Sequence, residues 1–223
     1  MSPTRGRPHA SSREMLADAA CELFLERGYE STSVAEITRR AGVSRSSFFN
    51  YFTSKSEILW YVFDRRIAAV ENALVGTEKS AAHDDAGGGF PEALRAFVLG
   101  EAPDTLALAI AESRTMDVED ELAAGRAARQ LRLAEAIGAR LRRDGLDELR
   151  TEITAAGYAA TLVGTVWRWA LMGAGRHRLD ALLEKSLCVA ESVFAATTSE
   201  LGELATPRAT AADPETPAEA PQT

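Results

Sequence analysis

Apolar residues recur at helical spacing along most of the chain, in segments separated by glycine, proline and polar residues. Leu16, Ala20 and Phe24 lie four residues apart, which places them on one face of an α-helix. Similar patterns follow each break, and no segment alternates apolar and polar residues as a half-buried β-strand does. The pattern therefore predicts an all-α protein of about nine helices.

The breaks also predict how the chain is organised. We expect a flexible basic arm over residues 1–10, a three-helix domain over 11–54, a connecting helix over 55–75, a linker over 76–89, a second helical domain over 90–201 and a disordered tail over 202–223. The linker holds the glycines at 87–89, and the tail is rich in Ala, Pro, Thr and Glu. Neither composition favours a packed core.

The most informative segment runs from Val34 to Lys55. A short helical pattern ends at Gly42, where a left-handed turn favours a residue without a Cβ atom. Ser44 is then a suitable N-cap for a second short helix. Two short helices joined by a tight turn that contains glycine form the helix-turn-helix pattern, whose second helix lies in the major groove of DNA.

Polar side chains remain for the outer face once Ile37, Ala41, Val43 and Phe48 are assigned to the small core between these helices. Short polar donors and arginine are the residue types that read base edges and phosphates. We expect contacts with bases or flanking phosphates from Arg45, Ser46, Ser47 and Asn50. We expect phosphate contacts from Ser33, Ser44, Tyr51 and Lys55. Ser54 and Glu57 have the spacing of a capping box at the start of the connecting helix.

Residues 13–60 resemble the DNA-binding domain of the TetR family of transcriptional regulators. The resemblance rests on Leu25-Glu26-Arg27-Gly28-Tyr29, Thr32–Ile37, Ala41–Ser44, Phe49–Phe52 and Ser54-Lys55. It implies an N-terminal helix-turn-helix domain, a C-terminal ligand-binding and dimerisation domain, and a homodimer that represses transcription from a palindromic operator. The family often has tyrosine at the position of Phe49, where its hydroxyl contacts a phosphate. Because Phe49 lacks that hydroxyl, we expect Tyr51 to carry more of the backbone contact.

A narrower resemblance concerns the TetR-type regulators of mycofactocin gene clusters. It rests on Arg5–Ala10 with Ser12-Arg13, on Ser44–Phe52 and on Ile58–Trp60. It implies an acyl thioester of coenzyme A as the ligand. Arg5 and Arg7 in the N-terminal arm have two interpretations, a hook that enters a narrow minor groove or part of a disordered tail.

Charge is distributed unevenly along the 223 residues, whose net charge is −8. Residues 1–66 hold 10 Lys and Arg against 8 Asp and Glu, whereas residues 67–223 hold 15 against 25. Only the N-terminal part needs to meet phosphate, so overall acidity does not exclude DNA binding. An architectural DNA-binding protein that ignores ligands is an alternative, but it would need excess positive charge throughout.

The two final helical patterns, about 147–172 and 180–200, carry more apolar surface than one small domain needs. We expect them to pair with a second copy in a four-helix bundle. A cavity for a small apolar or amphipathic effector is expected in the same domain. Candidate lining residues are Phe97, Arg114, Met116, Tyr158, Trp167, Arg168, Trp169 and Met172. Core packing of the aromatic residues and a solvated face for the arginines are the alternative interpretation of each one.

Catalytic and metal-binding patterns are lacking in the sequence. His9, His83 and His177 are scattered, the spacings fit no metal site, and no nucleophile or phosphate-loop motif appears. We therefore expect neither cofactor nor metal, and a helical enzyme is a weak alternative. Cys21 and Cys188 fit buried thiols in a reducing cytoplasm, with a redox role as the other possibility. No apolar run approaches a membrane span, and no secretory signal appears, which favours a cytoplasmic protein.

Overall fold

The structure, a computed structural model, describes residues 12–76 and 90–204, and these residues form ten α-helices. The helices are α1 (Ser12–Arg27), α2 (Val34–Ala41), α3 (Arg45–Tyr51), α4 (Lys55–Gly76), α5 (Phe90–Arg95), α6 (Asp104–Ala111), α7 (Ser113–Met116), α8 (Glu119–Arg143), α9 (Glu148–Leu171) and α10 (Leu179–Leu204). Over the same two ranges, β-type pairing is limited to an isolated bridge between Ala174 and His177. The predicted all-α fold is confirmed.

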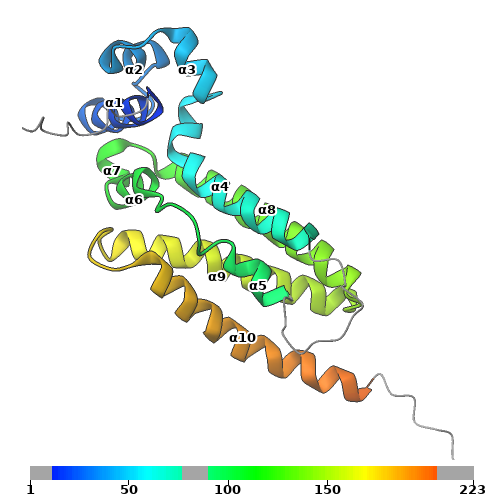
Figure 1. The fold of residues 1–223 in the computed structure, drawn as a ribbon. Helices are drawn as coiled ribbons and strands as arrows, with labels where there is room; N and C mark the ends of the chain where they lie inside the picture. The colour runs from blue at the N-terminus through cyan, green and yellow to red at the C-terminus, as the bar shows by residue number, and fades with distance from the viewer. Residues whose placement is uncertain (1–11, 77–89, 205–223) are drawn as a thin grey trace, which may run out of the picture.

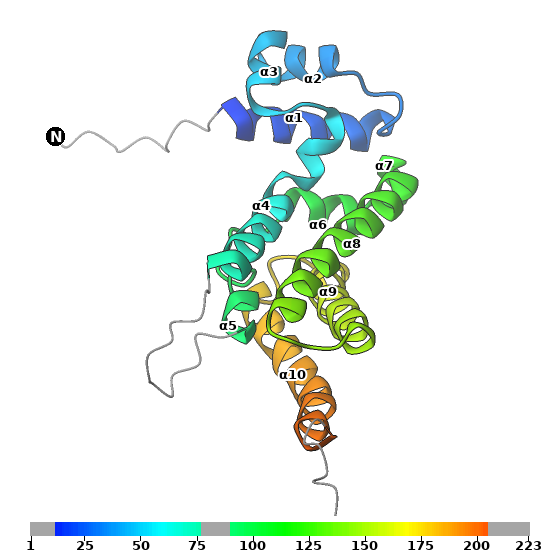
Figure 2. The same ribbon diagram turned by 90° about the vertical axis from the view of Figure 1, so that its right-hand side faces the viewer.

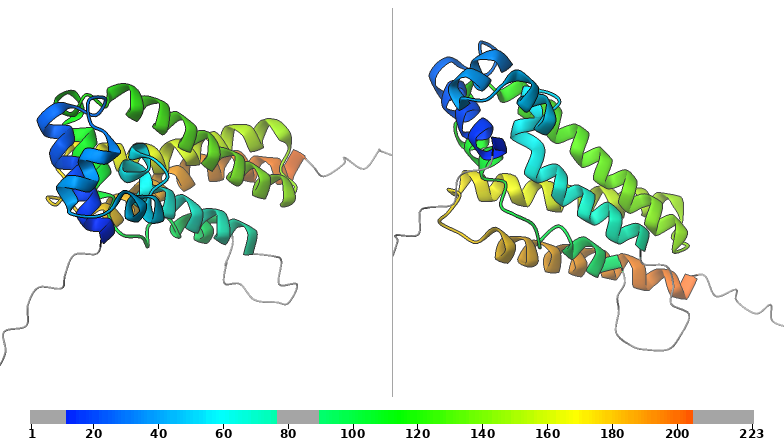
Figure 3. Two further views of the ribbon diagram at one scale, coloured as in Figure 1. Left: turned by 90° about the horizontal axis from the view of Figure 1, so that it is seen from above. Right: turned by 45° about the horizontal axis from the view of Figure 1, so that its top comes forward.

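The helices α1, α2 and α3 form a unit at one end of the molecule, and α4 leads away from it (Figures 1 and 2). α4 lies alongside α8, α8 packs against α9, and α10 covers the other side of α9 (Figure 3). α6 and α7 lie beneath α1, so the N-terminal unit contacts the rest of the protein at α6 and α7 as well as through α4. The N-terminal helices are therefore connected to the C-terminal helices in two ways, covalently through α4 and by the packing of α1 on α6 and α7.

Trp60 of α4 fixes the packing of α4 against α8. Its side chain is fully buried, and it lies so close to Gly125 that a Cβ atom there would be 2.3 Å from the indole ring. Arg129 covers the ring with its guanidinium carbon 4.0 Å from a ring centroid, and the same guanidinium group donates to both carboxylate oxygens of Asp64 at 2.7 and 2.6 Å. Glycine at position 125 therefore allows the two helices to approach closely.

Arg66 of α4 is buried although it is charged, and only 3% of it is exposed. Its guanidinium group donates to the backbone carbonyls of Phe97, Gly100 and Glu101 at 2.5, 2.6 and 2.7 Å. Burial lowers the pKa of Arg66, because the charged form loses hydration. Carbonyl acceptors replace that hydration, so the side chain ties the segment after α5 to α4.

Two predicted boundaries differ from the structure, because α4 includes Gly76, which was expected in the linker, and α10 continues beyond residue 201. α6 and α7 are separate helices, and Asp117, which follows the last residue of α7, has a positive φ of 54°. α10 continues to Leu204, so the first residues of the expected tail are helical. The arm over residues 1–10 and the linker from residue 77 to 89 lie outside the described residues. No described helix is long and apolar enough to span a bilayer.

Candidate nucleic-acid interface

α2 begins with a capping box formed by Ser33 and Glu36. The Ser33 hydroxyl accepts from the Glu36 backbone N–H at 3.3 Å, and a Glu36 carboxylate oxygen accepts from the Ser33 backbone N–H at 2.9 Å. The Ser33 backbone N–H and hydroxyl both donate to the Glu36 carboxylate and lower its pKa, because they stabilise the ionised form. The sequence contains the Ser-x-x-Glu signal of this cap, but only a phosphate contact was expected of Ser33. The cap therefore engages the Ser33 hydroxyl in hydrogen bonds with Glu36.

The turn between α2 and α3 is formed as the sequence predicts. Gly42 has a φ of 68°, in the left-handed region, and its N–H donates to the Arg39 carbonyl at 3.3 Å. The Val43 N–H donates to the Thr38 carbonyl at 3.0 Å. Ile37 and Phe48 are fully buried and Ala41 is nearly so, whereas Val43 is half-buried. The predicted core therefore sets the angle between the two helices.

Ser44 is the N-cap of α3, and its hydroxyl accepts from the Ser47 backbone N–H at 3.0 Å. The same oxygen lies 2.8 Å from the hydroxyls of both Ser46 and Ser47. Three hydroxyl groups therefore gather at the first turn of α3. Ser44 and Ser46 are exposed and Ser47 is half-buried, which leaves this polar cluster accessible to a ligand at the helix N-terminus.

Arg45 and Asn50 are exposed on α3. Neither side chain has an ion pair or a hydrogen bond with the described part of the chain. The Arg45 guanidinium carbon lies 5.8 Å from the ring centroid of Phe49, one helical turn later. A free guanidinium group and a free amide are the two groups that bind guanine and adenine edges in a bidentate manner.

Phe49 and Tyr51 are also exposed, by 50% and 41%, whereas Phe48 and Phe52 are buried beneath them. The ring of Phe48 contacts both Phe49 and Phe52, with centroids 5.2 and 5.8 Å apart. Aromatic packing thus holds the short α3 in place, because seven residues are too few for a stable isolated helix.

Lys55 is placed differently from the phosphate contact expected of it. Its ammonium group donates to the backbone carbonyls of Tyr29, Glu30 and Thr32 at 2.7, 3.5 and 3.4 Å, and it lies 4.1 Å from the Tyr29 ring centroid. All of these partners belong to the loop between α1 and α2. In this arrangement Lys55 fixes that loop, and a phosphate contact by its side chain requires another rotamer. Ser54 caps α4 as predicted, with its hydroxyl accepting from Glu57 N–H at 3.2 Å.

The neighbouring residues Arg39 and Arg40 have different surroundings. Arg40 pairs with Glu22 at 3.0 Å and with Glu26 at 2.7 Å, so it joins α2 to α1. Its hydrogen bond with Glu26 lowers the pKa of that carboxyl group. Arg39 is exposed and makes no ion pair with the described residues, which makes it a further candidate for a phosphate contact. The sequence alone does not distinguish these two arginines. Arg5 and Arg7 lie outside the described residues.

The structure does not gather the predicted pocket residues around one cavity. Phe97 and Met116 are fully buried in the core, whereas Arg114 is exposed and pairs with Glu119 at 3.4 Å. Met172 is 38% exposed. The other four line separate hollows: Tyr158 beside Phe90, Trp169 beside Arg66, Trp167 beside Leu122, and Arg168 between α9 and α10. The core-packing alternative describes Phe97 and Met116.

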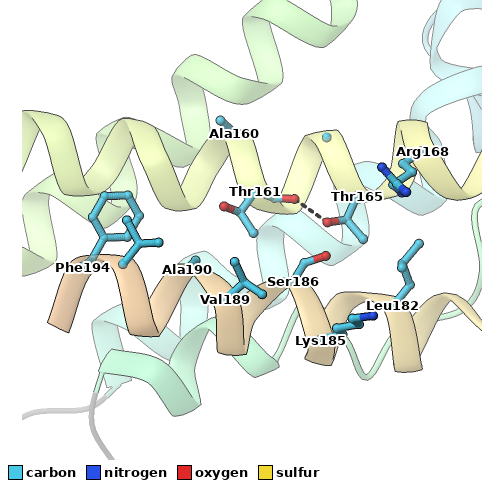
Figure 4. A pocket seen from close by; sticks show the side chains of 12 residues that line it. Ala160, Thr161, Thr165, Arg168, Leu182, Lys185, Ser186, Val189, Ala190 and Phe194 are labelled. Carbon is cyan, nitrogen blue, oxygen red and sulfur yellow. Dashed lines mark hydrogen bonds between the residues drawn. The ribbon is translucent and has the colours of Figure 1, made fainter. Parts of the chain in front are cut away.

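A groove of about 550 Å³ runs between α9 and α10. Figure 4 shows Thr161, Thr165 and Arg168 of α9 facing Leu182, Val189 and Phe194 of α10 across it. Gly164 of α9 lies in the groove, and a Cβ atom there would meet nothing within 4 Å. Val189 and Val193 are 56% and 59% exposed. This face of the two last helices therefore exposes apolar side chains in the single chain, beside the cations Arg168 and Lys185.

Two further sequence expectations concern possible metal ligands and the two cysteines. No group of three or more His, Cys, Asp or Glu side chains suited to a metal ion occurs within residues 12–76 and 90–204. Cys21 is buried, but Cys188 is exposed, so only one of the two thiols is buried as the sequence pattern predicts.

Residues 16–62 match the family model of bacterial regulatory proteins of the tetR family, over the same helices whose geometry is described above. Residues 16–62 thus have the DNA-binding domain of the tetR family. The capped turn at Gly42 and the exposed face of α3 lie within this matched segment. The expected family resemblance is confirmed.

Two curated relatives are similar to the same part of the chain. The mycofactocin biosynthesis transcriptional regulator MftR of Mycobacterium tuberculosis is 35% identical over 69 residues, which are 31% of this chain and 35% of MftR. The transcriptional repressor ComR of Escherichia coli is 33% identical over 81 residues, 35% of this chain and 39% of ComR. The chain thus spans little more than a third of the length of each relative. Both are regulators rather than enzymes.

The similarity in fold extends further along the chain. A TetR-family transcriptional regulator from Syntrophomonas wolfei aligns with a TM-score of 0.50, covering 82% of this chain and 94% of that one at 16% sequence identity. At this identity the likeness shows the fold alone. It includes the C-terminal helices, for which the sequence match gives no information.

Proposed function

We propose that this TetR-family regulator binds a palindromic operator as a homodimer and represses transcription until a small effector releases it. The recognition helix is α3, and Arg45, Ser46, Ser47 and Asn50 contact bases or flanking phosphates. Ser33, Ser44, Tyr51 and Arg39 hold the DNA backbone. Because the partner is duplex DNA of the chromosome, the protein acts in the cytoplasm.

The exposed face of α3 is the observation that carries this proposal. Arg45 and Asn50 make no ion pair or hydrogen bond through their side chains in the described part of the chain, and three serine hydroxyls gather at the N-terminus of the same helix. Buried aromatic residues position this face and leave its donors free. Such an arrangement of unpaired donors on a short, well-positioned helix fits direct readout in a major groove.

Two-fold pairing through α9 and α10 supplies the second half of the proposal. The groove between these helices is lined by small, apolar and hydroxyl-bearing residues together with Arg168 and Lys185, and Gly164 leaves space for a partner's side chains. Two copies joined on this face form a four-helix bundle of α9, α10 and their symmetry mates. The dimer presents two α3 helices to successive major grooves, about one helical turn apart.

An effector acts on this dimer by changing the position of α4, which connects the DNA-binding helices to the C-terminal helices. The proposed effector is small and apolar or amphipathic. The resemblance to mycofactocin regulators favours an acyl thioester of coenzyme A, although the similarity to MftR covers only the N-terminal third. An architectural protein without effector is less compatible with the acidic C-terminal part of the chain.

Arg45→Ala tests the proposed readout. We expect operator binding to weaken by about 1–3 kcal/mol, with lower discrimination between the operator and a shuffled duplex. Arg142→Ala is the matched control, because Arg142 lies at the far end of α8, where it pairs with Glu148. Fluorescence anisotropy with labelled duplexes measures both quantities. Unchanged affinity and specificity in Arg45→Ala would remove Arg45 from the proposed readout.

A further inference from the structure

A hollow of about 300 Å³ lies between α6, the first half of α8 and the end of α9. Its apolar lining includes Ile110, Leu122, Trp167 and Leu171, and its charged residues are Arg126 and Glu119. Figure 2 shows that the first half of α8 is the part of the helix nearest to the N-terminal unit. The hollow is therefore close to the junction between the two parts of the protein.

Arg126 differs from the arginines that follow it on α8. Arg129 pairs with Asp64, and Arg132 pairs with Glu71, both at 2.6 Å. Arg126 has no ion pair in the described part of the chain, and its guanidinium carbon lies 4.8 Å from the Trp167 ring centroid. Glu119, the acidic residue of the same hollow, is 3.4 Å from Arg114. One cation at the hollow thus remains available to an anion.

We propose that this hollow is an effector site for a small planar molecule that carries a carboxylate. Its ring lies against Trp167, and its carboxylate pairs with the guanidinium group of Arg126. A guanidinium fork matches the two oxygens of a carboxylate, and the indole face favours a flat apolar group. The volume lies at the lower end of the range for small-molecule pockets, which favours such a ligand over a coenzyme A thioester.

Trp167 links this site to α4. Its ring stacks on Trp60, with centroids 5.9 Å apart and an angle of 27° between the planes. The Trp60 indole N–H donates to a carboxylate oxygen of Glu121 at 3.2 Å, and the Ser56 hydroxyl donates to the same oxygen at 2.5 Å. A ligand that moves Trp167 therefore acts on the first two turns of α4, next to the DNA-binding helices. This regulatory consequence rests on the proposed function.

Calorimetry of the full chain with 1-naphthoate and with its neutral counterpart 1-naphthamide tests the site. We expect 1-naphthoate to bind about tenfold or more tightly than 1-naphthamide, since only the carboxylate forms a charge-assisted pair. Arg126→Gln should abolish that preference, whereas the matched control Arg142→Gln should keep it. Leu171→Glu provides a second variant, because 67% of Leu171 is exposed and its replacement leaves the core intact. The added negative charge should weaken 1-naphthoate binding and leave 1-naphthamide binding nearly unchanged.

Three results would overturn the proposed site. They are no binding of 1-naphthoate at millimolar concentration, an unchanged preference in folded Arg126→Gln, and tighter binding of octanoyl coenzyme A that neither variant alters. Operator binding by the ligand-free protein is measured on the same preparations. If the ligand-free protein binds its operator and any of these results is obtained, only the effector site is rejected. If the unmodified chain binds no operator, the proposed function is rejected.

Discussion

The backbone N–H of Tyr29 donates a hydrogen bond to the carbonyl oxygen of Met116 at 2.5 Å. Tyr29 belongs to the loop after α1, and Met116 is the last residue of α7. The adjacent Gly28 lies against Asp117, where a Cβ atom on Gly28 would be 3.3 Å from the Asp117 Cβ. The DNA-binding helices are thus joined to the C-terminal helices by a backbone contact, in addition to the covalent connection through α4.

Gly28→Ala tests the strength of this contact. Gly28 has a φ of 83°, so alanine is strained there, and the added Cβ atom also meets Asp117. Gly145→Ala is the matched control, because Gly145 has a φ of 93° and nothing within 4 Å of an added Cβ atom. We expect the control to lose about 1–2 kcal/mol of unfolding free energy through backbone strain, and Gly28→Ala to lose more. Urea denaturation measures both unfolding free energies. Equal losses in the two variants would mean that the contact between residue 28 and Asp117 contributes nothing beyond backbone strain.

Phe49→Tyr is expected to strengthen operator binding. Phe49 is half exposed on α3, the proposed recognition helix, so a hydroxyl at the ring edge should gain a phosphate partner without disturbing the core. The expected gain is about 0.5–1.5 kcal/mol, the usual net contribution of one hydrogen bond. Tyr51→Phe is the reciprocal change and should weaken binding by a similar amount. Anisotropy titrations at fixed salt compare the three proteins. Unchanged operator affinity in both variants would mean that neither aromatic residue contacts the DNA backbone.

The double change Val189→Asp and Val193→Asp should convert the proposed dimer to a monomer. Both side chains are more than half exposed in the single chain, so the fold of each copy tolerates the carboxylates. Their burial against a second copy would leave unpaired charges in an apolar interface. Leu131→Asp on α8, where 61% of the residue is exposed, is the control. Light scattering after size-exclusion chromatography gives the mass. A double variant that remains dimeric would locate the interface elsewhere.

Cys21 should resist thiol reagents until the protein unfolds. Burial raises the pKa of the Cys21 thiol to about 12, with further contributions from Asp18 and Glu22. Because the thiolate is the reactive form, the native chain at pH 8 holds almost none of it at this position. In a Cys188→Ser variant, we expect one slow reaction with Ellman's reagent, faster by about tenfold for each pH unit. In denaturant, the reaction of Cys21 with the reagent should be immediate. Rapid labelling of the native variant would contradict the buried position of Cys21.

Local signals explain how much of the site the sequence could predict. Gly42 and Ser44 determine the turn through their own backbone and side-chain chemistry, so their roles follow from residue type and spacing. Asp147 caps α9 for the same reason. The all-α fold follows from the repeated helical spacing, which needs no knowledge of tertiary contacts.

Contacts between distant segments account for what the sequence could not predict. Lys55 meets the carbonyls of a loop 23 to 26 residues earlier, and no local pattern reveals such a partner. Arg126 is a candidate ligand contact only because its neighbours on α8 find carboxylates on α4 and it does not. The eight predicted pocket residues were chosen by type, but the packing of the helices distributes them among several places.

Selection of bound sequences from a random pool of duplex DNA tests the proposed function most directly. The purified full chain is incubated with the pool, and the recovered duplexes are sequenced over several rounds. A dimer with two α3 helices in successive major grooves predicts an enriched inverted repeat, with half-site centres separated by about 10 base pairs or somewhat more. The complex should contain two chains for each duplex. An unenriched pool, or a single half-site bound by one chain, would contradict the proposal.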